Sequence, residues 1–208
     1  MIDRCDQGKY FWELRSCAYW QEFEEEKIFV PAIESGVKYA PDLHGYYGND
    51  KTNIIVTQEW RYVIAILNSS VSWWITQQEF SGKQGGFYEF KPMYVSKLPI
   101  PAATTRQKKI ISTIIDAVLK HRSQQLEQLL NGLVFELFFP KDLHAANIHL
   151  FDACEQAGIT QLAGLQGQAL VTQAQTWANT VFASNHPLYA MLFDLQALDV
   201  VRTIEGKA

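Results

Sequence analysis

The stretch NIIVTQEWRYVIAILNSSVSWWITQQEFSGKQGGFYEFKPMYVSKLPIP, residues 53–101, decides how the chain folds. It opens on a β-branched run, residues 53–57, which predicts a strand. From Trp60 the apolar side chains recur at spacings of three and four, which predicts a short helix; they are Tyr62, Val63, Ile66 and Leu67. The polar residues 68–70 are expected to end this helix and to cap the next segment, 71–79, which carries Trp73 and Trp74.

A glycine-rich segment follows, and it predicts a hairpin. Residues 81–86 form the turn and residues 87–90, which are rich in aromatics, form the returning strand. In the closing segment 94–101, Pro99 and Pro101 cannot donate to a sheet and bias the residues before them toward extended backbone. We therefore expect the chain to leave the sheet there. Leu67, Trp73 and Trp74 of the preceding helices are expected to lie in the core.

The order of these pieces resembles a known family. The helix Tyr62-Val-Ile-Ala-Ile-Leu-Asn-Ser69, the Gly-Gly-aromatic strand and the end Leu98-Pro-Ile-Pro101 are together similar to the target-recognition domain of TaqI-like specificity modules. The similarity extends upstream to residues 10–15 and 23–28 and downstream into a helical region. Such modules form the C-terminal part of adenine-N6 DNA methyltransferases and of type IIG restriction-modification enzymes. The resemblance implies that the chain binds double-stranded DNA and positions a target adenine for a methyltransferase domain, dependent on S-adenosylmethionine, that lies outside this chain.

Charge is unevenly distributed along the 208 residues. The net charge is −4, which is the wrong sign for a protein that holds DNA by charge alone. Through residue 110 the basic and acidic residues balance, so the whole excess of acids lies in the second part of the chain. DNA is therefore expected on the first part, with help from another domain.

Cysteine usage and hydropathy indicate the compartment. The three cysteines, Cys5, Cys17 and Cys154, are an odd number without CxxC spacing, which is typical of free thiols in a reducing cytoplasm. No apolar run approaches the roughly 20 residues that cross a bilayer. The N-terminus mixes acids with bases and does not resemble a signal peptide.

The loop-rich segment 34–52 and the hairpin turn 81–86 supply the candidate DNA contacts. Both alternate turn formers with lysines, amides and aromatic rings, the side chains that read base edges and phosphates. The candidates are Lys38, Tyr46, Tyr47, Asn49, Lys51, Lys83 and Gln84. For the first segment, a pair of hairpins whose tyrosines pack on a sheet edge is an equally weighted alternative. In the turn, Gln84 stands where a phosphate-binding Walker loop needs Ser or Thr, so nucleotide binding is excluded there.

After Pro101 the pattern becomes helical. Residues 106–138 predict one long amphipathic helix, or two broken near Asn131-Gly132. The stretch 120–125 is polar all round, which predicts a strut or coiled-coil arm that leaves the core. Further helices are expected over 145–157, 161–183 and 187–198. The predicted fold is α+β: a mixed, β-rich recognition domain, residues 1–101, followed by a helical spacer and a small helical bundle, residues 102–208.

The chain lacks the motifs of the chemistry that the resemblance implies. There is no glycine-rich cofactor loop after a strand and no Asn/Asp-Pro-Pro-aromatic tetrapeptide, so neither S-adenosylmethionine nor a flipped adenine is expected to bind here. The only nuclease-like piece, Glu25-Glu26-Lys27, has no aspartate before it in the required order. His144, His149 and Cys154 are spaced by five and do not line one helix face, so no metal site is predicted.

A competing hypothesis belongs to a different class. In it, the chain is a protein-interaction or dimerisation module, in which residues 106–138 dock a catalytic domain or a second copy and the β-rich part serves as scaffold. The acidic charge and the polar-sided helix favour this alternative. In both hypotheses the fragment is not itself an enzyme.

Overall fold

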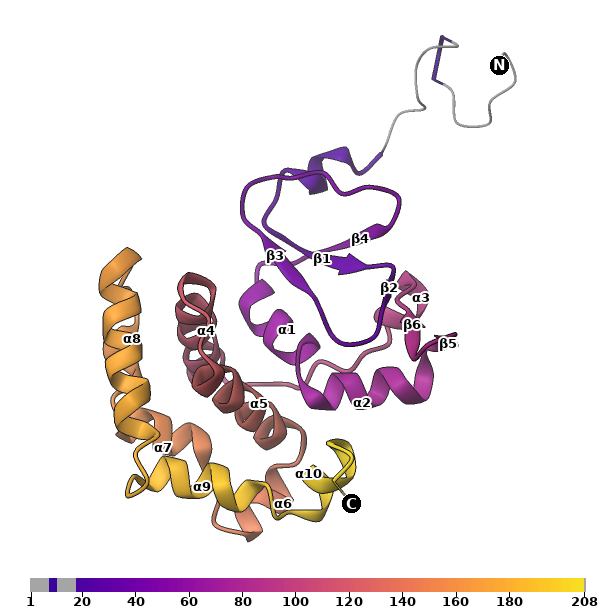
Figure 1. Ribbon diagram of the computed structural model, residues 1–208. Helices are drawn as coiled ribbons and strands as arrows, with labels where there is room; N and C mark the ends of the chain where they lie inside the picture. Colours follow the sequence, from indigo (N-terminus) through magenta and orange to yellow (C-terminus); the bar gives the residue numbers. More distant parts are fainter. Residues whose placement is uncertain (1–7, 11–17, 208) are drawn as a thin grey trace.

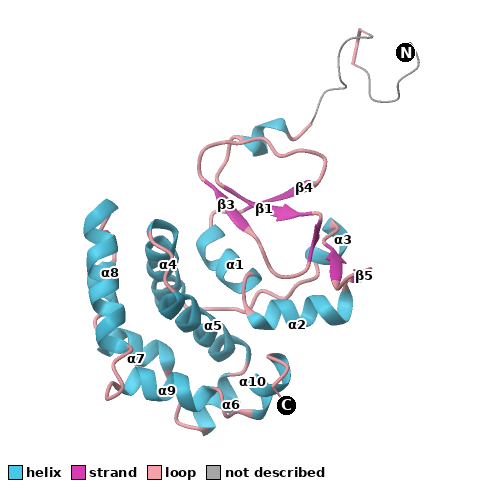
Figure 2. Ribbon diagram, viewed as in Figure 1, coloured by secondary structure: helices cyan, strands magenta, loops and turns pink. Residues whose placement is uncertain are grey.

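The computed structural model describes residues 8–10 and 18–207 (Figure 1). Two small antiparallel sheets and their helices occupy the first half, and helices alone make up the second, which confirms the α+β prediction (Figure 2). The segment 10–15, which takes part in the family resemblance, lies outside the described residues apart from Tyr10, as do Cys5 and Cys17. None of the helices in the described ranges combines the length and apolar character that crossing a bilayer requires.

The first half contains a 3₁₀ turn, six strands and three helices among its described residues. Their bounds are η1 Trp20–Phe23, β1 Lys27–Pro31, β2 Ile33–Glu34, β3 Ala40–Asp42, β4 Thr52–Val56, α1 Trp60–Leu67, α2 Ser70–Glu79, β5 Ser81–Lys83, β6 Phe87–Glu89 and α3 Pro92–Val95. The second half contains α4 Thr105–Lys120, α5 Gln124–Phe138, α6 Pro140–Ala145, α7 Leu150–Gln156, η2 Ile159–Leu162, α8 Gly167–Val181, α9 Pro187–Leu195 and α10 Asp199–Ile204.

The first sheet has the order β3-β1-β4, and both outer strands run antiparallel to β1. Ile28 and Val30 of β1 are almost fully buried, at 0 % and 1 % exposure, whereas Phe29 between them is only half-buried. Since side chains alternate across a strand, one face of the sheet is sealed, and α1 packs against β1 and β3 there. The opposite face carries Lys27 and Phe29.

Helices α1 and α2 form as the sequence predicts. Tyr62, Ile66 and Leu67 of α1 are buried, and Ser69 caps α2 by accepting a hydrogen bond from the backbone N–H of Ser72 at 3.2 Å. The core assignment is correct for Leu67 and wrong for Trp74. Trp73 packs edge-on against Tyr88, but Trp74 is 36 % exposed, because it falls on the outward side of α2.

The hairpin prediction is confirmed by β5 and β6, which pair with β2 in the second sheet, of order β2-β6-β5. The predicted strand exit over residues 94–101 is wrong in its first part. Pro92 stands at the start of a helix, where its missing N–H costs nothing, and α3 forms instead. Residues 98–104 then connect to α4 without regular structure.

A buried hydroxyl fixes this connection. Tyr62 donates to the backbone carbonyl of Pro101 at 2.7 Å. Burial, with a smaller contribution from Glu59, raises the pKa of Tyr62 to about 12, so the hydroxyl keeps its proton and remains a donor. The predicted boundary between residues 101 and 102 falls at this anchored point.

The predicted arm is wrong. The polar stretch is a turn, because α4 ends at Lys120 and Ser123 caps α5 by accepting from the N–H of Leu126. The polar side chains of this stretch face solvent at the turn between α4 and α5, and no helix projects from the core there. Helices α4 and α5 pack on each other and on α1, and α4 also contacts α7 and α8 (Figure 2). One hydrophobic cluster therefore runs through both halves of the described chain.

Of the two alternatives for residues 106–138, two helices form, but the break lies at residues 121–123 and α5 runs unbroken through Asn131-Gly132. Gly132 has a packing role instead. A Cβ built on Gly132 would lie 2.8 Å from Leu192, 3.0 Å from Leu150 and 3.3 Å from Leu195. All three leucines are buried, at 0–1 % exposure. The glycine thus lets α7 and α9 approach α5.

We expect Gly132→Val to lower the free energy of unfolding by about 1–3 kcal/mol, because the added methyl groups must displace buried leucines. Urea denaturation followed by far-UV circular dichroism measures the change. Gly36→Val is the matched control, since a Cβ there meets nothing within 4 Å. Equal midpoints for the two variants would contradict the packing role.

Candidate nucleic-acid interface

Residues 43–51 cross the open face of the first sheet. Strand β3 ends at Asp42, opposite Lys27, and β4 begins at Thr52, opposite Pro31, so the connection must run the length of β1, about 13 Å. It passes over Phe29, because a Cβ on Gly48 would lie 3.2 Å from the Phe29 ring. We call residues 43–51 the crossover loop.

A buried ion pair lies under the start of the crossover loop. Lys27 Nζ lies 2.5 Å from Asp42 Oδ2, with side-chain exposures of 0 % and 2 %, and also donates to the carbonyl of Phe23 at 2.5 Å. The Asp42 carboxylate in turn accepts the backbone N–H groups of His44 and Tyr46, at 2.9 and 2.7 Å. The ion pair therefore fixes the backbone that presents Tyr46 and Tyr47.

The environment of Asp42 favours its charged form. Burial alone would raise the pKa of Asp42. The hydrogen bonds from Lys27, His44 and Tyr46, with the charge of Lys27, outweigh burial and hold the pKa below its ordinary value of 3.8. The carboxylate is therefore ionised at neutral pH, and the loop start remains anchored.

The aromatic side chains of the crossover loop extend outward. Tyr46 is 64 % and Tyr47 60 % exposed. The Tyr47 ring stacks on Phe23 at 5.1 Å between centroids, its hydroxyl donates to Glu24, and Phe23 stacks in turn on Tyr19 at 6.0 Å. Phe23 thus links the loop to η1.

Two exposed aromatic residues of this surface were missing from the sequence prediction. Tyr19 and Trp20 are 54 % and 53 % exposed on or beside η1. Their helical spacing with Phe23 was visible in the sequence, but their exposure was not. Together with Tyr46 and Tyr47 they form what we call the aromatic surface.

Asn49 has a structural part in the crossover loop. Its Oδ1 accepts the N–H of Lys51 at 2.9 Å and the hydroxyl of Thr52 at 3.2 Å. Lys51 follows at the exposed end of the loop, where its ammonium pairs with Asp50 at 2.9 Å. Both partners are about three-quarters exposed, at 74 % and 79 %. Such a pair is weak and screened by salt, so a phosphate can replace the carboxylate.

The remaining candidates lie apart from the crossover loop. Lys83 and Gln84 are at the β5–β6 hairpin, whose turn uses Gly85 and Gly86 at positive φ, and Lys83 pairs with Glu89 at 3.1 Å. Lys38 precedes β3 and pairs with Glu34 at 2.7 Å. Figure 1 shows the β5 hairpin on a different side of the domain from the crossover loop. The structure therefore groups Tyr46, Tyr47, Asn49 and Lys51 on one loop, whereas Lys38 and the hairpin residues Lys83 and Gln84 lie apart from that group.

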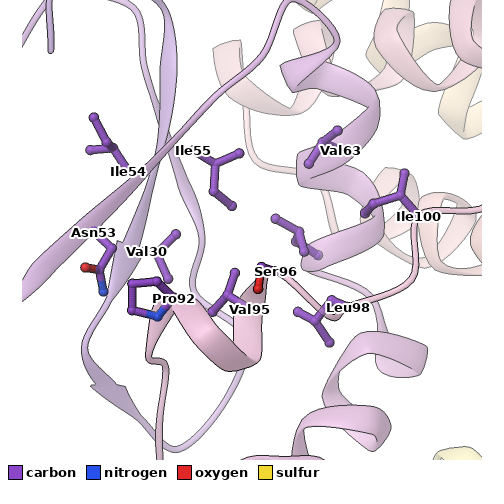
Figure 3. Close-up of a pocket in the computed structure, with 11 residues that line it drawn as sticks. Val30, Asn53, Ile54, Ile55, Val63, Pro92, Val95, Ser96, Leu98 and Ile100 are labelled. Carbon is purple, nitrogen blue, oxygen red and sulfur yellow. The ribbon is translucent and has the colours of Figure 1, made fainter. Parts of the chain in front are cut away.

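An apolar groove lies between β4, α1 and α3 (Figure 3). It has a volume of about 360 Å³, and its lining includes Ile55, Val63, Val95 and Leu98. Only Asn53 and Ser96 bring polar side chains to it, and no base or metal ligand is among the residues that line it. The groove is therefore suited to apolar packing and not to acid–base chemistry.

The small sheets carry aromatic, amide and cationic side chains on their loops, and helices pack beneath them. These are the side-chain types that contact bases and phosphates. The comparison with protein families points to the same kind of site. Residues 4–100 match the model of the TaqI-like C-terminal specificity domain, the family that the sequence was predicted to resemble. The match ends at residue 100, so the predicted extension into the helical region is not part of it. No curated protein matches the chain.

The family gives the coarse function. A specificity domain recognises DNA in a restriction-modification context and is itself non-catalytic.

Proposed function

We propose that this chain is the DNA target-recognition module of an adenine-N6 DNA methyltransferase or a type IIG restriction-modification enzyme. The methyltransferase domain, with its S-adenosylmethionine, would be supplied outside this sequence. The observation that carries the proposal is the family match over residues 4–100. The crossover loop adds a physical basis, because it presents exposed aromatic rings and a weakly paired lysine on an anchored backbone.

In the mechanism we infer, the lysines contact phosphates, and the tyrosines and the glutamine contact bases or sugars. Lys51 exchanges its exposed partner Asp50, and Lys83 its half-buried partner Glu89, for a DNA phosphate, and both fix the position of the duplex. Tyr46 and Gln84 have exposed side chains that reach base edges or sugars, and Tyr47 offers the exposed part of a ring that is held by Phe23 and Glu24. The acidic residues of η1 and the segment after it limit non-specific attraction, so tight binding is expected to need the basic surface of the methyltransferase domain.

We expect Lys51→Glu and Lys83→Glu each to weaken binding of every duplex by a similar factor, because a phosphate contact carries no sequence information. The slope of log affinity against log salt should become shallower by about 1 for each variant. Fluorescence anisotropy with labelled duplex pools at low salt measures both quantities.

Lys141→Glu is the matched control, since it makes the same change of charge at an exposed position on α6. It should bind DNA like the unaltered chain. If both lysine variants bind like this control, Lys51 and Lys83 do not contact DNA. If no duplex binds the unaltered chain, the recognition proposal fails for this fragment.

The finer assignment to adenine methylation needs its own test. The complete gene, expressed in a host without N6-methyladenine, should introduce that base at one short sequence. Methylation that appears only on cytosine, or not at all, would contradict the assignment.

The interaction-module alternative loses its main support. It required an arm over residues 106–138 with a free face, but α4 and α5 bury their apolar residues within the chain; Ile111, Ile114, Leu129 and Leu133 are each 0 % exposed. A dimer through this helix pair would have to unfold the core first.

A further inference from the structure

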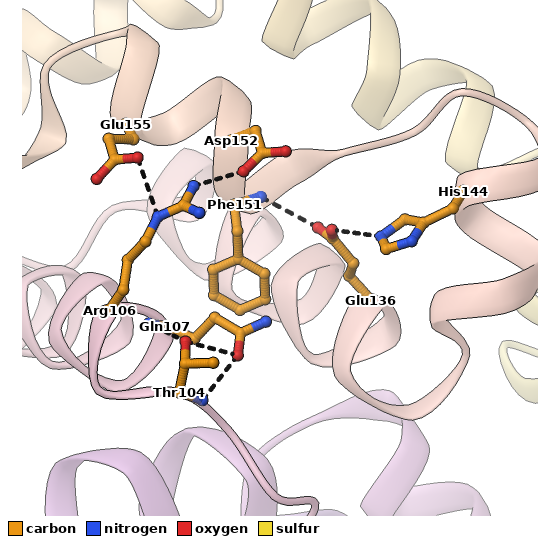
Figure 4. A network of polar contacts seen from close by, with 8 residues as sticks. All are labelled: Thr104, Arg106, Gln107, Glu136, His144, Phe151, Asp152 and Glu155. Atoms are coloured by element: carbon orange, nitrogen blue, oxygen red, sulfur yellow. Dashed lines mark hydrogen bonds and ion pairs between the residues drawn. The ribbon is translucent and has the colours of Figure 1, made fainter.

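Outside the recognition surface, a buried carboxylate lies among the C-terminal helices. Glu136 of α5 has a side chain that is 7 % exposed. One of its oxygens lies 3.0 Å from Nε2 of His144, and the other accepts the backbone N–H of Phe151 at 3.0 Å (Figure 4). Within the described ranges no lysine or arginine pairs with it, because the neighbouring Arg106 is bound to Asp152 and Glu155 (Figure 4). The charge of Glu136 is therefore left without a full cationic partner.

A tight chain reversal brings a second histidine to the same place. After α6, Ile148 N–H bonds to the carbonyl of Leu143 and Asn147 N–H to that of His144, at 2.9 and 3.0 Å. Asn147 adopts φ +58°, so this is a Schellman helix end with asparagine in the left-handed position. The reversal places His149, which precedes α7, beside His144.

The two imidazole rings stack next to Glu136. Their centroids are 4.4 Å apart and their planes differ by 22°. One ligand atom from each of Glu136, His144 and His149 lies within 4.8 Å of the other two. The spacing of five along the sequence concealed this cluster, because the histidines meet through a turn and not along a helix face.

We propose that Glu136, His144 and His149 form a binding site for a divalent transition-metal ion of the zinc type. Two imidazole nitrogens and one carboxylate oxygen are a ligand set that Zn²⁺ accepts, with bonds of about 2.0–2.2 Å. Tetrahedral bonds of that length place ligand atoms about 3.3 Å apart. The separation of 3.0 Å between His144 and Glu136 is already close to this value, and the His149 ligand atom, within 4.8 Å of the other two, would have to move closer by up to about 1.5 Å.

A divalent ion would bring more charge to Glu136 than one protonated histidine. A protonated His144 would supply one positive charge to the carboxylate, whereas a divalent ion would supply two and would also bind His149, whose ring is stacked on His144.

The surroundings of the cluster define the rest of the coordination sphere. His144 is 45 % exposed, so an ion can reach the site and a water molecule can complete the coordination. Cys154 is not a ligand: its side chain is buried, and burial and the nearby Glu136 raise the pKa of its thiol, which keeps it protonated.

Zinc titration of the chelator-treated chain tests the proposal. Calorimetry with ZnCl₂ should give saturable binding of one ion per chain, and a hundredfold excess over Kd should raise Tm by about 5 °C or more. Glu136→Gln and His144→Ala should each weaken binding by about tenfold or more. Glu136→Gln keeps an acceptor for Phe151 N–H, so it is expected to fold; its melting curve without metal checks this.

The matched control is His121→Ala, which removes an exposed histidine at the end of α4 and should bind zinc like the unaltered chain. Cobalt(II) should give visible d–d bands without a thiolate charge-transfer band. A thiolate band would place the ion on cysteines and overturn the proposal. The same holds if zinc fails to saturate the chain, or if the Glu136 and His144 variants bind as the control does.

Discussion

Asp42→Ala is expected to lower the free energy of unfolding by about 3–5 kcal/mol, because it leaves a buried lysine without its counter-charge. Lys27 is 0 % exposed and cannot turn into solvent without displacing the crossover loop. The same substitution frees the backbone N–H groups of His44 and Tyr46. Urea denaturation followed by far-UV circular dichroism measures the loss of stability. Because the loop start is no longer anchored, DNA binding should weaken even below the unfolding transition.

Asp50→Ala is a control from the same loop. It also removes an aspartate paired with a lysine, but both partners are largely exposed, at 79 % and 74 %. The expected change is below about 1 kcal/mol. If Asp50→Ala proves as damaging as Asp42→Ala, burial is not what gives the Lys27–Asp42 pair its importance.

The pKa of Asp42 predicts how the pair responds to acid. Its pKa in the folded chain lies below 3.8, the ordinary value for the unfolded chain. The carboxylate therefore contributes its full stabilisation above pH 3.8 and loses it as the pH falls from there through the folded pKa. The stability difference between the unaltered chain and Asp42→Ala should shrink over that acidic range and remain constant above it.

Local patterns were sufficient to predict the elements between residues 53 and 90. The apolar spacing gave α1, the serine pair gave the cap of α2, and the glycines gave the β5–β6 hairpin. The errors arose at polar residues and at a glycine that are each compatible with two different structures. Residues 121–123 could solvate an exposed arm or a turn, and Gly132 could end a helix or admit close neighbours; in each case only the packing of α4, α5 and α9 decides.

The candidate site was predictable only as a list of exposed side chains. Tyr46 and Tyr47 stood out by composition, and the structure shows them exposed. Their support was not predictable, because Lys27 and Asp42 meet only through the register of β1 and β3. The Glu136 cluster likewise depends on the helix end at Asn147, which has a positive φ. The sequence Ala145-Ala146-Asn147 does not predict that conformation.

Trp60→Ala should lower the free energy of unfolding by about 3–5 kcal/mol. Trp60 begins α1 and is 1 % exposed, and its indole N–H donates to Glu26 at 2.6 Å. The guanidinium of Arg61 lies 4.2 Å from the centre of its ring. Because α1 contacts β1 and β3 on one side and α4 and α5 on the other, the cavity left by the indole would loosen both halves of the chain together. Far-UV circular dichroism in urea is the suitable measurement, since it does not depend on the fluorescence of the residue removed.

Trp20→Ala is the control for Trp60→Ala, because it removes an exposed tryptophan in place of a buried one. Trp20 is 53 % exposed, so its removal should change stability by less than about 0.5 kcal/mol. As part of the aromatic surface, it should instead weaken DNA binding. Similar midpoints for the two variants would contradict the position of Trp60 in the core. The shape of the Trp60→Ala transition tests the shared core as well: if α1 couples the halves, the curve remains a single step, whereas two steps would show that residues 102–208 unfold separately.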